Sequence, residues 1–144
     1  MKKVLFICTG NTCRSPMAQG LFNQYAHKKN LDIQAESAGL AAMDGQFITP
    51  YASDVLLEVG VDMSVHHAHQ LTREDVDEAT LIFGMTENHV TTLAAIFPQA
   101  MDKILLFGRG IDDPFGGDLE LYRLCRDQIQ KEIPLVAKLV ECRP

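Results

Sequence analysis

The chain has 144 residues, of which 47 % are hydrophobic and 22 % charged, values typical of one globular domain rather than of a disordered or fibrous protein. Lysine and arginine number 13 against 19 aspartate and glutamate residues, which gives a formal net charge of -6. This acidic balance argues against nucleic acid or an anionic membrane as the principal partner. We therefore expect a single domain over residues 1–144 with neither kind of partner.

The cysteines and the N-terminus indicate a cellular location. The apolar run after Lys3 has five residues, too short for the core of a signal peptide, and no segment is long and apolar enough to cross a membrane. A domain of this size does not need disulfides for stability. We expect a cytoplasmic protein with four cysteines that are mostly thiols, namely Cys8, Cys13, Cys125 and Cys142.

Four short apolar segments predict β-strands. In chain order they are residues 4–7, 32–37, 80–83 and 103–107. Because segments with helical periodicity lie between them, the pattern predicts an α/β fold with an open, mainly parallel sheet of about four strands flanked by helices. Ligands of such folds bind at the carboxyl ends of the strands.

Five helices are expected, each beginning at a residue that can cap its N-terminus. The capping residues are Ser15, Thr49, Thr72, Thr86 and Asp118. Ser15 and Thr49 each precede a proline suited to the first helical position, and Thr72 with Asp75 resembles a capping box. Three helix ends are marked in the sequence, by Lys28 with Lys29, by Gly60 and by Pro98. Pro134 should kink or interrupt the last helix.

The loop between the first strand and the first helix has the residues needed to bind phosphate. It comprises Cys8, Thr9, Gly10, Asn11, Thr12, Cys13, Arg14 and Ser15. Gly10 permits a turn that directs backbone N–H groups at an anion, and the next helix adds the positive end of its dipole. Arg14 offers a planar fork for two phosphoryl oxygens. In these surroundings the Cys8 thiol should ionise readily and act as a nucleophile. The alternative is a buried structural cysteine that an arginine follows by chance.

A cysteine nucleophile that accepts a phosphoryl group needs an acid for the leaving group and a base for water. Asp112 and Asp113 both lie in the glycine-rich stretch 108–118, which follows the fourth expected strand. Spacing alone does not distinguish the two carboxylates. An Asp-Pro turn without chemistry is the structural alternative.

The segment CTGNTCRSPMA resembles the signature of the low-molecular-weight protein tyrosine phosphatase family, a cysteine, five residues, then arginine and serine. Further matching segments are Ser37-Ala38-Gly39, His66 through Thr72, Met85 and Asp113-Pro114-Phe115. The resemblance implies hydrolysis of phosphorylated protein side chains through a cysteinyl-phosphate intermediate. It implies Cys8, Arg14 and Asp113 as catalytic residues, the aspartate directly before proline being the acid. It also implies that no metal or organic cofactor takes part.

The same resemblance implies supporting residues. Ser15 would donate a hydrogen bond to the Cys8 thiolate, and a polar network would brace the loop through Asn11, Ser37 and His66. Cys13 would form a reversible disulfide with Cys8 and so protect it from over-oxidation. Each of these residues also has a purely structural alternative, as a helix cap, a solvated loop residue or a small packing residue.

Three histidines, His66, His67 and His69, lie close together in the sequence. No cysteine or carboxylate flanks them at a spacing typical of metal ligands, so we do not expect a metal site there. His69 stands where many members of the family carry arginine.

Two features resemble the bacterial protein-arginine phosphatase branch of the family. Thr12 stands where typical tyrosine phosphatases carry isoleucine or another bulky aliphatic residue, and a hydroxyl suits a guanidinium better than a phenyl ring. Phe115 is followed by two glycines, where many tyrosine phosphatases have a second aromatic residue that clamps the ring. We therefore lean to phosphoarginine, the alternative being a purely phosphotyrosine-specific enzyme.

Two further classes of protein fit the sequence less well. An arsenate reductase of this fold needs two more cysteines near the third strand, and residues 14–124 contain none. A non-catalytic phosphate-binding module would be expected to lack the nucleophile or the acid, whereas Cys8 and Asp113 are both present.

Overall fold

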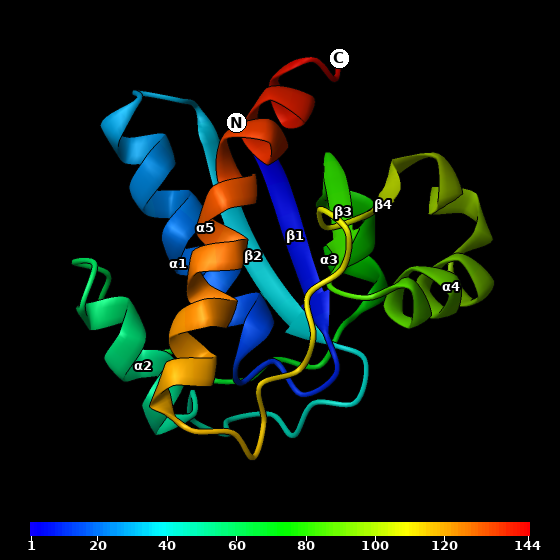
Figure 1. Ribbon diagram of the computed structural model, residues 1–144. Helices are drawn as coiled ribbons and strands as arrows, with labels where there is room; N and C mark the ends of the chain where they lie inside the picture. Colours follow the sequence, from blue (N-terminus) through cyan, green and yellow to red (C-terminus); the bar gives the residue numbers. More distant parts are fainter.

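Four parallel strands form one sheet in the order β2-β1-β3-β4. The computed structural model describes residues 1–144, and its strands are β1 (Lys2–Cys8), β2 (Ile33–Gly39), β3 (Leu81–Gly84) and β4 (Ile104–Leu106). Helices lie on both faces of this sheet (Figure 1). The expectation of an α/β fold with an open parallel sheet of about four strands is confirmed.

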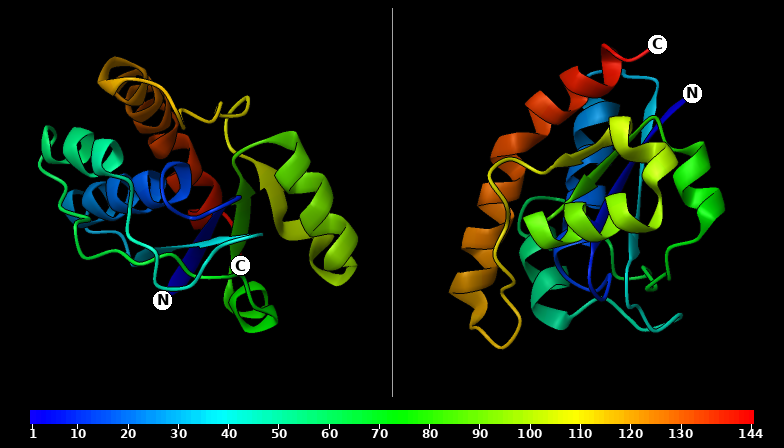
Figure 2. Two further views of the ribbon diagram at one scale, coloured as in Figure 1. Left: turned by 90° about the horizontal axis from the view of Figure 1, so that it is seen from below. Right: turned by 90° about the vertical axis from the view of Figure 1, so that its right-hand side faces the viewer.

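Two layers of helices enclose the sheet (Figure 2). One layer consists of α1 (Arg14–Lys28), α2 (Pro50–Leu57) and α5 (Leu119–Glu141). The other consists of α3 (Arg73–Glu78), α4 (Glu87–Ile96) and the 3-10 helix η1 (Pro98–Lys103). Because successive side chains of a strand point to opposite faces, Phe6 of β1 packs in the first layer while Leu5 and Ile7 pack in the second. No helix is long and apolar enough to cross a membrane.

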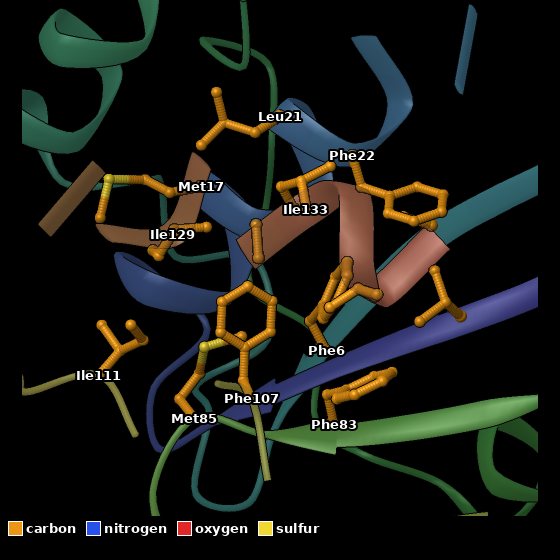
Figure 3. Packing of buried hydrophobic residues seen from close by; sticks show 14 of the residues in the cluster. Phe6, Met17, Leu21, Phe22, Phe83, Met85, Phe107, Ile111, Ile129 and Ile133 are labelled. Carbon is orange, nitrogen blue, oxygen red and sulfur yellow. The ribbon is translucent and has the colours of Figure 1, made fainter. Parts of the chain in front are cut away.

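The larger core lies between the sheet and the layer formed by α1, α2 and α5. Figure 3 shows the side chains of Phe6, Phe83 and Phe107 beside one another over β1 and β3. Phe6 lies 5.7 Å from Phe107 and 6.0 Å from Phe22, measured between ring centroids. Phe6 has no exposed surface, so its replacement by alanine would cost about 3–5 kcal/mol of stability. This packing makes β1 a rigid support for the residues at its carboxyl end.

The register of the sheet brings several loops together at that end. Cys8 is paired with Gly39 of β2, and Ile7 with Gly84 of β3. A side chain at position 39 would have its Cβ only 2.5 Å from the carbonyl oxygen of Thr9, so glycine is required there. The loop that follows β4 descends to the same edge, whereas the two termini lie at the opposite end of the sheet (Figure 1).

The expected start of the first helix is wrong. The sequence placed Ser15 at the N-cap and Pro16 at the first helical position, but α1 begins at Arg14, with Cys13 as the N-cap residue and no side-chain cap. The physical reason is a competing tertiary contact, since the Ser15 hydroxyl lies 2.8 Å from Cys8 Sγ.

The other helix starts are where the sequence put them. Thr72 and Asp75 form a capping box, and Thr86 and Asp118 accept cap hydrogen bonds. Thr49 is the N-cap residue of α2, and Pro50 takes the first position, although the Thr49 side chain makes no cap bond.

One expected helix end is confirmed, and one expected interruption is wrong. Gly60, with a φ of +79°, closes α2: its N–H donates to the Leu57 carbonyl oxygen at 3.1 Å, and the Val61 N–H donates to the Leu56 carbonyl oxygen at 2.9 Å, the pattern of a glycine that ends a helix. Pro134 does not interrupt α5, which continues from Leu119 to Glu141. The buried side chains of Ile133 and Val136 flank the proline, and their packing in the core outweighs the local loss of one helical hydrogen bond.

Candidate active site

The loop Cys8–Ser15, here called the phosphate loop, connects β1 to α1 and lies at the carboxyl end of the sheet. Together with residues 108–118, here called the acid loop, it surrounds a pocket of about 200 Å³. The lining residues are Cys8, Thr9, Gly10, Thr12, Cys13, Arg14, Asp113 and Phe115. The structure therefore brings together residues from two segments about 100 positions apart.

The backbone of the phosphate loop presents donors to this pocket. None of the N–H groups of residues 9–15 donates to a backbone carbonyl of the protein. The first N–H groups of any helix lack intrahelical partners, and here the loop before the helix adds more such groups. Asn11 has a φ of +56°, and residues with such backbone angles take part in concave arrangements of N–H groups. The loop is thus suited to surround an anion such as a phosphoryl group.

The Arg14 guanidinium is fixed between the two loops. Its side chain is 6 % exposed, and Nη1 donates to the carbonyl oxygen of Ile111 at 2.9 Å. Nη2 lies 3.6 Å from Asp113 Oδ2. These contacts orient the planar fork beside the pocket and connect the acid loop to the phosphate loop.

A chain of hydrogen bonds reaches the Cys8 sulfur. Asn11 Nδ2 donates to Ser15 Oγ at 2.8 Å and to Ser37 Oγ at 2.9 Å. Ser37 donates in turn to Gln19 Oε1. Because the Ser15 oxygen already accepts from Asn11, its own proton is free to point at Cys8 Sγ, 2.8 Å away. A thiolate at Cys8 would receive that hydrogen bond.

Two histidines hold Asn11 from the other side. His66 Nε2 lies 3.1 Å from the Asn11 carbonyl oxygen, and the His69 backbone N–H donates to Asn11 Oδ1 at 2.9 Å. Burial lowers the pKa of His66 below its usual value, so its ring is neutral at pH 7 and its Nε2–H donates to the carbonyl. Asn11 itself has no exposed surface.

The three neighbouring histidines do not converge on one point. His69 Nε2 pairs with Asp75 Oδ2 at 2.7 Å, and the His67 ring packs on Phe47 at 4.9 Å between centroids. The structure contains no group of three or more histidine, cysteine or carboxylate side chains placed to hold a metal.

The geometry distinguishes the two aspartates that spacing left equal. Asp113 lines the pocket, and its Oδ1 accepts the Phe115 N–H at 3.0 Å, which leaves Oδ2 near Arg14. Asp112 does not line the pocket and faces a separate hollow beside Cys125. Of the two carboxylates, only Asp113 therefore borders the pocket that Cys8 and Arg14 line.

The cysteines other than Cys8 lie in different surroundings. Cys13 lines the pocket but is largely buried, and burial, followed by the charge of Asp113, raises the pKa of its thiol. Burial raises the pKa of Cys125 to about 12, and this residue packs in the core. Cys142 is exposed near the C-terminus, and nothing in the structure assigns it a role.

The sequence did not indicate two features near the pocket. Tyr51 and Tyr122 pack edge to face with centroids 5.5 Å apart and, with Phe115, line a second hollow of about 370 Å³. His89 bonds to the phosphate loop through Thr9. Its position three residues after Thr86, where a capping box usually has glutamate or glutamine, is the only sequence signal that could have drawn attention to it.

Comparisons with known proteins agree with this geometry. The family model described as low molecular weight phosphotyrosine protein phosphatase matches residues 3–142. The chain is 38 % identical to a protein-arginine-phosphatase of Geobacillus stearothermophilus, covering 96 % of each chain. It is 32 % identical to the low molecular weight protein-tyrosine-phosphatase Wzb of Escherichia coli K12, covering 83 % of this chain and 82 % of that one.

A solved structure, the YwlE arginine phosphatase from Geobacillus stearothermophilus, superposes with a TM-score of 0.89 at 36 % identity. The superposition covers 98 % of this chain and 94 % of that one. Sequence and structure thus lead to one conclusion: the chain belongs to the low molecular weight phosphotyrosine protein phosphatase family.

Proposed function

We propose that the chain is a cysteine-dependent protein phosphatase that hydrolyses phosphoarginine and phosphotyrosine side chains of proteins, with phosphoarginine preferred. The observation that carries the proposal is the position of Cys8 Sγ at the base of the phosphate loop, with Ser15 Oγ 2.8 Å away. A thiolate there has a hydrogen-bond donor for its charge and a ring of N–H groups for the phosphoryl oxygens.

The first step transfers the phosphoryl group to the enzyme. The Cys8 thiolate attacks phosphorus, an S–P bond forms, and the bond from phosphorus to the leaving oxygen or nitrogen breaks. Asp113, protonated at the start, gives its proton to the leaving atom. Arg14 and the N–H groups of residues 9–15 stabilise the charge on the phosphoryl oxygens.

The second step releases phosphate. The Asp113 carboxylate now takes a proton from water, whose oxygen attacks phosphorus, and the S–P bond breaks. The electron pair returns to Cys8 as a thiolate, which the Ser15 hydroxyl stabilises. Asp113 is left protonated and ready for the next cycle, so no metal or organic cofactor is required for the proton balance.

The substrate preference rests on the walls of the pocket. Thr12 and Phe115 both line it, so a leaving group meets one hydroxyl and one aromatic ring. A guanidinium offers N–H donors, which the Thr12 hydroxyl oxygen would accept, whereas a phenyl ring gains only from Phe115. Relatives named protein-arginine-phosphatase in Geobacillus stearothermophilus and Bacillus subtilis, at 38 % and 34 % identity, support the same preference.

Two further parts of the proposal concern the thiols. Cys13 borders the same pocket as Cys8, so a peroxide-oxidised Cys8 would be captured as a Cys8–Cys13 disulfide that thiols reduce again. The mechanism needs Cys8 as a free thiol, which a reducing compartment maintains. We therefore place the enzyme in the cytoplasm, acting on phosphorylated proteins.

A side-by-side assay tests the proposal. Wild type, Cys8→Ser, Thr12→Ile and, as a matched control, Thr92→Ile on the exposed face of α4 are compared on phosphoarginine and phosphotyrosine peptides. We expect wild type and the control to favour phosphoarginine in kcat/KM, Thr12→Ile to reverse the ranking, and Cys8→Ser to be inactive. A ranking that Thr12→Ile leaves unchanged would contradict the role of Thr12. Equal activity of wild type and Cys8→Ser would contradict the mechanism.

A further inference from the structure

His89 is a buried histidine in the first turn of α4 that takes no part in the chemistry described above. The residue is 6 % exposed, and both ring nitrogens make hydrogen bonds. Nδ1 accepts the backbone N–H of Thr86 at 3.2 Å, and Nε2 lies 2.9 Å from Thr9 Oγ1. Thr9 directly follows the nucleophile Cys8.

The hydrogen-bond donors around the His89 ring determine which of its two nitrogens carries the proton. Because the Thr86 N–H points at Nδ1, that nitrogen is an acceptor, and the single proton of a neutral imidazole is on Nε2. His89 therefore donates to the Thr9 hydroxyl. Burial, followed by the charge of Arg14, lowers the pKa of His89 to about 4, so the ring keeps this neutral form at pH 7.

The fold holds His89 rigidly against the loop. The Met85 N–H donates to the Ile7 carbonyl at 2.9 Å, which places the residues after β3 beside those after β1. A Cβ on Gly84 would lie 3.0 Å from His89 Cβ, so the first turn of α4 packs directly against the end of β3. His89 thus extends from a helix, not from a mobile loop.

We propose that His89 is a positioning residue of the phosphate loop, which fixes Thr9 through its hydroxyl and so holds the first N–H donors of the loop in the geometry that binds phosphate. This inference deepens the proposed function. It depends on one part of that function, namely that the phosphate loop binds phosphate. The other side of Thr9 is held by its carbonyl oxygen, which accepts the Ala41 N–H at 2.9 Å. His89 supplies the constraint on the side chain.

A role as a helix cap would explain the contact of Nδ1 with Thr86 but not the contact of Nε2 with Thr9. The variants are therefore chosen to remove one of these contacts at a time. In His89→Asn the short amide oxygen can still accept from Thr86, but its side chain does not extend to Thr9. In His89→Gln an amide N–H at the far end can replace Nε2–H, and glutamine is a normal capping-box residue. Thr9→Val removes the hydroxyl, Thr9→Ser keeps it, and His27→Asn on exposed α1 surface is the matched histidine control.

The readouts are the affinity for inorganic phosphate by calorimetry, KM and kcat on an aryl phosphate, and the thermal unfolding midpoint. We expect His89→Asn and Thr9→Val each to weaken phosphate binding about tenfold, which corresponds to about 1.4 kcal/mol, with a matching rise in KM and a smaller change in kcat. We expect the double variant His89→Asn/Thr9→Val to be no weaker than the worse single variant. His89→Gln should bind phosphate more tightly than His89→Asn, Thr9→Ser should bind it more tightly than Thr9→Val, and the control His27→Asn should bind as wild type does.

Wild-type phosphate affinity in both His89→Asn and Thr9→Val would overturn the proposal, and so would additive losses in the double variant. If His89→Asn does not fold, the contrast between Thr9→Val and Thr9→Ser decides alone. Phosphate binding does not depend on turnover, so a wild type that binds phosphate without hydrolysing the aryl phosphate would contradict the proposed function and leave the role of His89 standing. A wild type that binds no phosphate would overturn both.

Discussion

Replacing Asn11 by alanine should destabilise the protein while leaving the nucleophile Cys8 in place. The side chain makes three hydrogen bonds, two from Nδ2 to Ser15 and Ser37 and one to Oδ1 from the His69 N–H. The residue is fully buried, and its φ is +56°. Alanine would therefore lose three partners and keep a strained backbone.

The magnitude follows from these contacts. Three lost hydrogen bonds at about 1 kcal/mol each give about 3 kcal/mol, and alanine in a left-handed conformation adds about 1 kcal/mol. The expected loss for Asn11→Ala is thus about 4 kcal/mol, against a total stability of about 5–15 kcal/mol for a domain of this kind. Asn11→Gly removes the strain and should lose about 1 kcal/mol less.

Urea unfolding of wild type and variants measures these differences. With a slope of about 2 kcal/mol per molar urea, Asn11→Ala should lower the midpoint by about 2 M. Asn30 is the matched control, because it also has a positive φ, +54°, but is exposed, so Asn30→Ala should show only the strain of about 1 kcal/mol. A loss below about 1 kcal/mol in Asn11→Ala would refute the view that this network braces the loop, and equal values for alanine and glycine would refute the contribution of strain.

Two further predictions concern the chemistry. Asp113→Asn should lower kcat about 10²- to 10⁴-fold and leave the phosphate affinity unchanged. Asp112→Asn makes the same charge change outside the pocket and should leave kcat near the wild-type value. A large loss of kcat in Asp112→Asn, with none in Asp113→Asn, would reverse the assignment of the acid. Because the pKa of the Cys13 thiol is raised above its ordinary value of 9.0, less than about 1 % of it is ionised at pH 7. Iodoacetamide at pH 7 should therefore label exposed Cys142 and leave Cys13 unlabelled, and the labelling of Cys13 should rise only above pH 9. Peptide mapping by mass spectrometry measures the labelling of both cysteines. Rapid labelling of Cys13 at pH 7 would contradict its burial.

The features that sequence could predict are those set by local chemistry. The apolar run 4–7, the glycine-containing loop after it and the Thr72–Asp75 capping box all depend on neighbouring residues, and the structure has each of them. The parallel sheet followed from the alternation of strands and helices. The same local reasoning placed Ser15 at a helix cap, and it was wrong because the hydroxyl instead contacts Cys8 across the loop.

The features that sequence could not predict depend on contacts between distant segments. Asp112 and Asp113 are neighbours, so spacing alone does not distinguish them; the family resemblance favoured Asp113, and the fold places Asp113 in the pocket beside Arg14. Thr9 and His89 are 80 positions apart, and the register of β1 with β3 brings them together. Pro134 is tolerated because the packing of α5 outweighs a local preference.

In the proposed mechanism, Cys8 carries the phosphoryl group during turnover. The most direct measurement is rapid acid quenching of Asp113→Asn during reaction with an aryl phosphate, followed by peptide mapping under acidic conditions, because this variant should slow hydrolysis of the intermediate. We expect one phosphoryl group, attached to the peptide that contains Cys8 and absent from a Cys8→Ser/Asp113→Asn control. Turnover without any phosphorylated peptide, or phosphate attached to another residue, would contradict it.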